Sequence, residues 1–197
     1  MSRQRQRVQH ERAYVLHSMA WRETSLLIQV FSQQYGTVSL VAKGAKRPYS
    51  ALRAVLSVFQ PLHVGWTGAN EVKTLTQAEC AGLHVLSGRA MMSVWYMNEL
   101  LLRLLPKEDP HDVLFTAYEQ ALEHLAHHPK QASLALRRFE WILLQETGYG
   151  LDQQLPDFSD VEQEPYLRTL LRERLDELLG RPLRTRGVMM DLLHLQS

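Results

Sequence analysis

The stretch "TSLLIQVFSQQYGTVSLVAKG", residues 24–44, decides the fold of the first part of this chain. Its two ends are rich in β-branched and aromatic residues, and "QQYG" between them has the composition of a turn. In the second run Val38, Leu40 and Ala42 occupy every other position, which predicts a strand with one buried face. The stretch therefore predicts two neighbouring strands joined by a short turn.

Similar apolar runs lie on both sides of this pair, at "RAYVLHSM" (12–19), "LHVGWTG" (62–68) and "EVKTLTQAE" (71–79). The segment "ALRAVLSVFQP" (51–61) lies between the third and fourth runs and is predicted to be a short helical or irregular excursion. Five short strands within about 80 residues are too few for a seven-stranded sandwich. They favour a small Greek-key barrel of the OB type.

Beyond Gly88 the apolar residues recur with the period of a helix. We predict helices at 89–105, from the N-cap candidate Asp109 to about 127, at 131–147 before Gly148, at 166–180, and at 187–195 after Thr185. The acidic, proline-containing segment near 151–165 is predicted to be a loop. The predicted fold class is α+β, with a five-stranded OB-type barrel in residues 1–80 and an all-α domain in residues 81–197.

The net charge of +1 conceals two oppositely charged halves. Residues 1–80 contain 10 Lys and Arg against 4 Asp and Glu, and residues 81–197 contain 12 against 17. The first part therefore carries a net charge of +6 and the second a net charge of −5. Such an asymmetry indicates that the first part meets a polyanion and that the second meets something else, such as another protein.

Cys80 is the only cysteine, so neither an internal disulfide nor a cysteine-based zinc site can form. The N-terminal "MSRQRQRVQHER" does not resemble a signal peptide, and no apolar run approaches the length of a membrane span. We therefore expect a soluble, cytoplasmic protein that does not contact membranes. Arg3, Arg5 and Arg7 are interpreted as a loose tail in preference to a phosphate contact.

No motif for enzymatic chemistry emerges. The chain has no phosphate loop, no G-x-S-x-G elbow and no cluster of carboxylates for metal-dependent phosphodiester chemistry. His124, His127 and His128 form a helical stripe that could bind a metal, but imidazoles at a helix C-terminus also interact favourably with the helix dipole, and that reading is preferred. We predict no catalytic residue, no cofactor and no bound metal.

A basic turn follows the second of the two central runs, with Lys43, Lys46 and Arg47 around Gly44 and Pro48. Three cations within five residues repel one another unless an anion lies among them. A bound polyanion and an ordinary solvated turn are both compatible with this segment. Tyr49 directly follows the turn and is expected to be exposed, where its ring could stack on an unpaired base.

A second candidate surface lies on the helix predicted at 131–147. Arg137, Trp141 and Leu144 are spaced to share one helical face, and Arg138 lies at its margin. An arginine beside apolar side chains could hold a peptide that ends in an apolar residue and a carboxylate. The alternative is a core-facing tryptophan with an arginine reaching out from its edge.

Several of these segments together resemble the bacterial recombination mediator family RecO. The resemblance rests on "RETSLL", "VAKGAKR" and "KTLTQAE" in the first part and on "LRRFEWILLQETGYG" and "GRPLRTRGVMMDLL" in the second, so it spans nearly the whole chain. It implies an OB-fold followed by a helical domain. It also implies a non-enzymatic DNA repair protein in the cytoplasm, associated with the nucleoid.

The resemblance implies partners as well. RecO proteins bind single- and double-stranded DNA, anneal complementary strands covered by the single-strand DNA-binding protein, and with RecR help to load RecA. We expect the DNA contacts to come from Lys43, Lys46, Arg47, Tyr49, Arg53, Arg22 and Lys73. We expect the C-terminal tail of the single-strand DNA-binding protein to meet Arg137, as anchor, with Arg138, Trp141 and Leu144.

One departure from the family pattern is visible. Many RecO proteins carry a lobe with four cysteines for zinc after "GYG", whereas in this chain the segment near 151–165 leads almost directly into the next helix. We expect this lobe to be reduced to a loop. The alternative function is a protein-interaction adaptor whose basic domain does not itself act on DNA.

Overall fold

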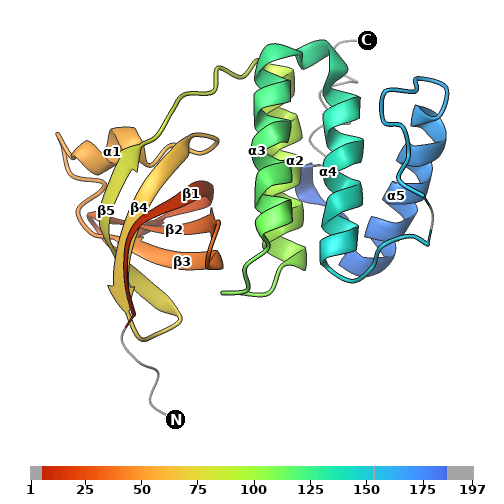
Figure 1. The fold of residues 1–197 in the computed structure, drawn as a ribbon. Helices are drawn as coiled ribbons and strands as arrows, with labels where there is room; N and C mark the ends of the chain where they lie inside the picture. The colour runs from red at the N-terminus through yellow and green to blue at the C-terminus, as the bar shows by residue number, and fades with distance from the viewer. Residues whose placement is uncertain (1–5, 153, 186–197) are drawn as a thin grey trace. The chain divides into compact units, whose positions relative to one another are not determined.

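The structure, a computed structural model, describes residues 6–152 and 154–185 and contains two compact units (Figure 1). The first consists of the described residues up to His84 together with Leu105–Asp112. The second consists of Val85–Leu104 and the described residues from Val113 onward. The sequence predicted one division after residue 80, whereas the first unit also takes in the segment between two helices.

The first unit is a closed barrel of five strands, as predicted. The strands are β1 (Gln6–Trp21), β2 (Ser25–Ser32), β3 (Gly36–Ala42), β4 (Pro61–Gly68) and β5 (Val72–Cys80), in the spatial order β1-β2-β3-β5-β4. All neighbours are antiparallel except β3 and β5. The register of β1 shifts between Val8 and Glu11 and between Val15 and His17. These irregularities bend the long strand, so that it pairs with β2 and with β4.

The interior of the barrel is filled by the alternating side chains that the sequence indicated. Val38, Leu40 and Ala42 of β3 are all buried, and Trp66 of β4 is fully enclosed. The Tyr35 ring meets the Trp66 ring edge-on, with 5.3 Å between centroids. A short helix, α1 (Ala51–Val55), follows the basic turn, where the sequence predicted a short excursion. Burial of these side chains supplies most of the free energy that holds the strands in register.

The segment Leu105–Asp112 packs against the barrel near the start of β3. The Glu108 N–H donates to the Thr37 carbonyl over 3.0 Å, and the Thr37 hydroxyl donates to the Pro106 carbonyl over 3.0 Å. A Cβ atom on Gly36 would lie 1.9 Å from the Asp109 carbonyl oxygen, so no larger residue fits there. Asp109 is therefore part of this packed segment. The prediction of Asp109 as the N-cap was wrong, because α3 begins at Asp112, two residues after the predicted first helical residue, Pro110.

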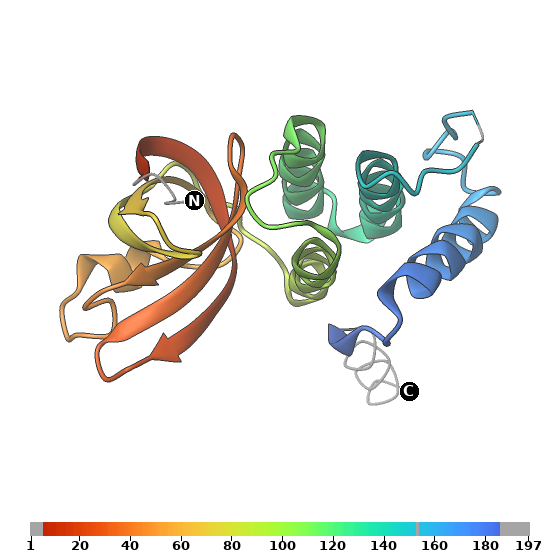
Figure 2. The same ribbon diagram turned by 90° about the horizontal axis from the view of Figure 1, so that it is seen from below.

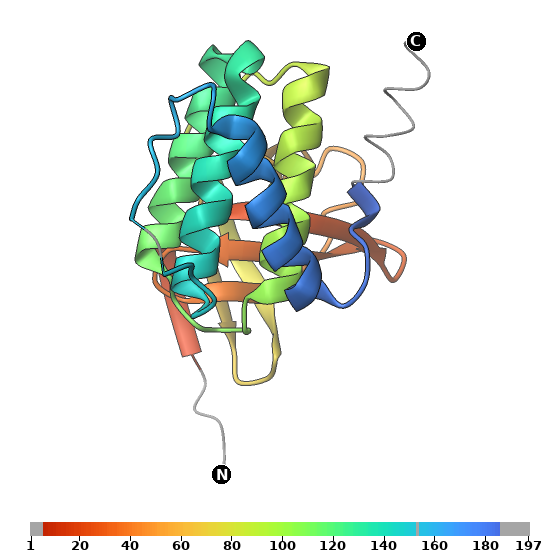
Figure 3. The same cartoon turned by 90° about the vertical axis from the view of Figure 1, so that its right-hand side faces the viewer.

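The second unit is helical, as Figures 2 and 3 show from two directions. It contains α2 (Gly88–Leu104), α3 (Asp112–His127), the 3-10 turn η1 (Pro129–Gln131), α4 (Ala132–Glu146) and α5 (Glu164–Leu179). Gly148 has a φ of 80° just after α4, which confirms the predicted left-handed end of that helix. The helix predicted at 187–195 lies outside the described residues.

Helix α5 packs through a stripe of leucines spaced four residues apart. Leu167, Leu171 and Leu175 are buried, and α5 lies beside α4 (Figure 3). The rest of the α5 surface is largely polar, which is the pattern of a helix that covers one side of a bundle. Within the described residues, no helix combines the length and apolar character that a membrane span requires.

Candidate nucleic-acid interface

Two turns meet at one end of the barrel and bring together cations that are far apart in sequence. The Lys46 N–H donates to the Thr24 carbonyl over 2.9 Å, and the Lys46 Nζ lies 3.5 Å from the Arg22 carbonyl. These contacts join the β1–β2 turn to the turn after β3. We call Arg22, Lys43, Lys46, Arg47 and Tyr49 the basic rim.

The cations of the basic rim are exposed and have no carboxylate partner among the described residues. Arg53 on α1 is exposed as well, and its N–H donates to the Ser50 carbonyl at the end of the same turn, over 3.1 Å. Uncompensated like charges held close together raise the free energy of the unliganded protein, and an anion would lower it. The rim therefore offers several point charges and a guanidinium-rich surface suited to phosphate groups.

The backbone of the basic rim is strained at two of its members. Arg22 has a φ of 52° and Tyr49 a φ of 63°, in the left-handed region that residues other than glycine rarely adopt. Tyr49 is 104% exposed, so no burial of its ring offsets this cost. Gly44 has a φ of 72° and lies beneath the Arg47 side chain. The expectation that Tyr49 is exposed is confirmed, and the turn holds it in a conformation that packing does not explain.

Lys73 does not join this surface. Its side chain is only 4% exposed, and its Nζ lies 2.5 Å from the Glu108 carboxylate, so its charge is already neutralised inside the first unit. Lys107 pairs in the same region with Glu71. We therefore correct the prediction that Lys73 contacts DNA. Sequence alternation does not reveal this pairing, because Glu108 is 35 residues away.

Arg7 is part of the barrel wall and not of a loose tail. It lies in β1 opposite Thr67 of β4, so the interpretation of a loose tail was wrong for this residue. With Gln9, Thr67, Thr76 and Gln77 it lines a shallow polar hollow on the outside of β1, β4 and β5. Arg3 and Arg5 lie outside the described residues.

In the second unit, Arg137 belongs to a buried charge network. One of its Nη atoms lies 2.7 Å from Glu140 Oε1 and the other lies 3.9 Å from Glu164. The Tyr96 hydroxyl donates to the same Glu140 oxygen over 2.7 Å. The Glu140 side chain is 2% exposed and that of Arg137 is 11% exposed. Arg137 therefore compensates a carboxylate that would otherwise be costly to bury.

The predicted apolar part of the tail-binding face is not on the surface. Trp141 and Leu144 are both buried, and the Trp141 ring meets the Phe158 ring edge-on at a centroid distance of 6.3 Å. Of the four residues predicted there, only Arg138 is exposed. The core interpretation holds for Trp141 and Leu144, because both are buried and the loop between α4 and α5 brings Phe158 against the Trp141 ring.

A second charge cluster fixes the end of the described chain to α2. The Glu99 carboxylate accepts hydrogen bonds from the Arg184 N–H, the Thr185 N–H and the Thr185 hydroxyl over 2.8 to 2.9 Å. Burial alone would raise the pKa of Glu99, but these hydrogen bonds and the Arg103 guanidinium together hold it below its ordinary value. Arg103 also donates to the Arg181 and Pro182 carbonyls. No local sequence signal pairs these groups.

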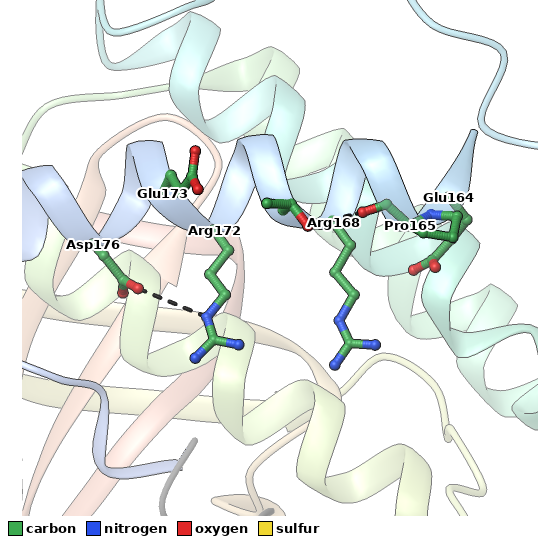
Figure 4. A pocket seen from close by; sticks show the side chains of 7 residues that line it. Glu164, Pro165, Arg168, Arg172, Glu173 and Asp176 are labelled. Carbon is green, nitrogen blue, oxygen red and sulfur yellow. Dashed lines mark hydrogen bonds and ion pairs between the residues drawn. The ribbon is translucent and has the colours of Figure 1, made fainter.

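A shallow groove runs along the outer side of α5 (Figure 4). Arg168 and Arg172 are one turn apart and point the same way, and Arg172 lies 3.8 Å from Asp176. Glu164, Glu173 and Asp176 also line the groove. Because three carboxylates accompany two guanidinium groups, this groove is less suited to a polyanion than the basic rim.

The histidine stripe of α3 has ordinary local contacts. The His127 Nδ1 lies 2.8 Å from the Glu123 carbonyl, and the His124 and His128 rings lie 5.1 Å apart. Burial and the neighbouring His128 lower the pKa of His124. Among the described residues, no group of three or more His, Cys, Asp and Glu side chains is arranged to hold a metal ion.

Comparison with known proteins gives a consistent result for both units. The sequence profile described as "Recombination protein O N terminal" matches residues 6–84, and the one described as "Recombination protein O C terminal" matches residues 86–154. The DNA repair protein RecO of Aromatoleum aromaticum is 49% identical over 163 residues, which cover 82% of this chain and 67% of that protein.

Two further relatives carry the same description. The RecO protein of Cupriavidus metallidurans is 40% identical over 237 residues, covering 96% of this chain and 79% of that protein. The RecO protein of Ralstonia nicotianae is 51% identical over 150 residues, covering 76% of this chain and 55% of that protein. Since 96% of 197 residues is about 189, about 48 of the 237 aligned positions in the Cupriavidus comparison have no counterpart in this chain.

Proposed function

This chain belongs to the RecO family of DNA repair proteins, and from this premise we propose that its barrel binds the DNA backbone through the basic rim. RecO proteins are non-enzymatic recombination mediators. The observation that carries the proposal is the group of exposed cations without carboxylate partners among the described residues, namely Arg22, Lys43, Lys46 and Arg47. Phosphates would supply the missing counter-charge.

The basic rim can bind both single- and double-stranded DNA, because its point charges contact the phosphate backbone and not the bases. We propose that the protein uses this contact to anneal complementary strands covered by the single-strand DNA-binding protein. Together with RecR it would help RecA to load on such strands. The neutralisation of phosphate charge by the rim supports the annealing step, since two bare strands repel each other.

The test is annealing of complementary strands precoated with the single-strand DNA-binding protein, followed by a fluorescence readout with and without this protein and without ATP. We expect annealing to accelerate only when the protein is present. An unchanged annealing rate, together with unchanged DNA mobility, would reject the proposal. The same strands without the coating protein serve as the control for direct strand contact.

Salt dependence separates DNA binding from the adaptor function. Backbone contacts release counterions, so the logarithm of the affinity should fall linearly with the logarithm of the salt concentration. With four rim cations on phosphates the slope should be about −3 to −4. An adaptor whose barrel contacts no DNA would show no affinity for DNA at any salt concentration.

For the acidic tail of the single-strand DNA-binding protein, we propose a contact at Arg137 and Arg138, with Trp141 and Leu144 supporting α4 from the core. Arg138 is exposed, and the longer of the Arg137 contacts, 3.9 Å to Glu164, is one that a ligand carboxylate could replace. Arg138→Ala should weaken binding of the tail peptide, as measured by titration calorimetry, without lowering the stability of the protein. Unchanged affinity would place the tail elsewhere.

A further inference from the structure

The outer face of β1, β2 and β3 carries an apolar row beside the basic rim. Met19 pairs with Leu27, and Leu27 pairs with Val41, so these three side chains project from the same face. The neighbouring row, Ser18 with Ile28 and Leu40, points inward, and both Ile28 and Leu40 are fully buried. The row with Met19 is therefore on the outside of the barrel.

Trp21 extends this row to the edge of the rim. It lies two residues beyond Met19 on the same strand, where it pairs with Ser25 at the β1–β2 turn. Trp21 is 40% exposed and Met19 is 49% exposed. The other tryptophan of the barrel, Trp66, is fully buried. Arg22 follows Trp21 directly, so an aromatic surface and a cation of the basic rim are adjacent in the chain.

Tyr49 provides a second exposed ring on the same rim. Its turn is joined to the β1–β2 turn through the two Lys46 contacts. The left-handed backbone at both Arg22 and Tyr49 costs free energy that no packing of the Tyr49 ring recovers. Strained residues that contribute nothing to packing are frequent where a ligand is bound.

Exposed aromatic rings between cations are the chemistry that single-stranded nucleic acid requires. Cations take the phosphates, and each ring offers a flat apolar surface on which an unpaired base stacks. A duplex hides its base faces inside the stack and offers only backbone and groove edges. We propose that Trp21 and Tyr49 form a stacking site for unpaired nucleobases, with Met19 flanking it. This proposal rests on the proposed function, because it needs the strand backbone on the basic rim.

The consequence is a preference for single strands that the cations alone cannot produce. Stacking on one aromatic side chain typically changes affinity about 5- to 150-fold per base. The preference should not depend on base sequence, since every base has a stacking face. The basic rim would then set how tightly DNA binds, and the two rings would set which form of DNA binds better.

The test compares strands that differ only in their bases. Fluorescence anisotropy would measure the affinity of the full chain for an oligothymidylate, for a strand of equal length with abasic sites in place of thymidines, and for a duplex. Wild type should bind the abasic strand at least about 5- to 150-fold more weakly than the oligothymidylate, which is the loss of one stacked base, and more weakly still if both rings stack. Trp21→Ala and Tyr49→Ala should each lose affinity for the oligothymidylate and keep affinity for the abasic strand and the duplex.

Two further variants control for folding and for the site. Trp21→Phe keeps a ring and should restore most of the affinity. Trp95→Phe removes an exposed tryptophan of α2 and should change no affinity. Quenching of tryptophan fluorescence by the oligothymidylate should persist in Trp95→Phe and shrink in Trp21→Phe. If Trp21→Ala lost its folded circular dichroism spectrum, the stacking site would be tested by the affinity of wild type for the abasic strand and by the quenching in Trp21→Phe and Trp95→Phe.

Equal affinity of wild type for the oligothymidylate and the abasic strand would overturn the stacking site. So would equal losses on single strand and duplex in a folded Trp21→Ala variant. Neither result contradicts the proposal that the basic rim binds the DNA backbone. That proposal is contradicted only if wild type binds none of the three nucleic acids. The two proposals therefore stand or fall on different measurements.

Discussion

The cations of the basic rim and two arginines of the helical unit, Arg103 and Arg137, are arranged in opposite ways. Lys43, Lys46 and Arg47 are exposed and meet no carboxylate of the described residues, whereas Arg137 and Arg103 each contact a carboxylate inside their unit. Paired and buried charges hold a fold in one arrangement, and unpaired exposed charges are available to a ligand. This difference predicts where a substitution changes stability and where it changes binding.

The largest expected effect is on stability, at Arg137. Arg137→Ala would leave the buried Glu140 carboxylate with the Tyr96 hydroxyl but without its cation. Loss of one partner of a buried pair costs about 3 kcal/mol or more of the free energy of unfolding. Urea unfolding would measure it. Arg138→Ala, one residue further on and exposed, is the matched control and should change stability by less than about 0.5 kcal/mol. Equal stabilities of the two variants would contradict the network.

The next effect is on binding, at the basic rim. Replacing Lys43, Lys46 and Arg47 together by Glu should lower DNA affinity by about two orders of magnitude, because three attractions become repulsions. The slope of log affinity against log salt should become shallower by about 2 to 3. Thermal unfolding should change little, since these side chains are exposed. An unaltered slope in the titrations would mean that DNA binds elsewhere on the molecule.

Lys73 is a paired cation within the barrel unit itself, in contrast to the cations of the basic rim. Lys73→Ala removes the partner of Glu108, a carboxylate that is itself half exposed, so stability should fall by about 1 to 2 kcal/mol. DNA affinity and its salt slope should stay at the wild-type values, in contrast to the rim variant. A shallower slope for Lys73→Ala would show that its ammonium reaches a phosphate after all.

One carboxyl in each unit, Glu99 and Glu11, should also respond in opposite ways to acid. The pKa of Glu99 is held below its ordinary value of 4.5, so its contribution to stability is present above that pH and is lost as the pH falls through the lowered pKa. Burial raises the pKa of Glu11 in the barrel, despite hydrogen bonds from the Gln34 and Gln33 N–H groups. Protonation of Glu11 therefore stabilises the barrel as the pH falls through its raised pKa.

Unfolding curves between about pH 3 and 7 would check both signs. Glu99→Gln should weaken the loss of stability on acidification, and Glu11→Gln should make that loss steeper, because it removes a group that gains stability in acid. If both variants kept the pH profile of wild type, neither carboxyl would have a pKa shifted by folding.

The smallest effect concerns the strained tyrosine. Tyr49→Gly relieves a left-handed backbone that glycine adopts without cost, so stability should rise by about 0.5 to 1 kcal/mol in thermal unfolding. Tyr49→Ala retains the Cβ atom and should not gain this stability. A Tyr49→Gly variant no more stable than Tyr49→Ala would show that the turn is not strained at this position.

The sequence predicted the architecture well, because alternation and helical periodicity are local. The five strands, the short excursion after the basic turn and the helices through α5 all have the predicted type, and the deviations are confined to their ends. The clearest deviation is at Asp109. There the local capping pattern is overridden by the packing of Asp109 against Gly36. This contact cannot be predicted from neighbouring residues, because Gly36 is far from Asp109 in the sequence.

The sequence predicts the net charge of a segment more readily than it predicts which individual cations are exposed and which are paired. The three cations of the turn after β3 were read correctly as exposed, since Gly44 and Pro48 exclude a continuous strand. Lys73 was expected at the DNA surface because of the family resemblance, but it is paired with Glu108 inside the barrel unit. Arg137, which we propose as a tail contact, is also paired with a carboxylate of its own unit. The place of Trp21 on the outer face depends on strand register, which the sequence did not specify.

By itself, then, the sequence determined the basic barrel, the acidic helical part and the family, since each depends on composition, periodicity or the order of motifs along the chain. Only the tertiary structure decided which of the described cations remain without carboxylate partners, and it joined the turn that follows Trp21 to the turn that carries Tyr49. The physical reason is that an ion pair or an exposed ring depends on distances between residues far apart in the chain, and folding alone fixes those distances.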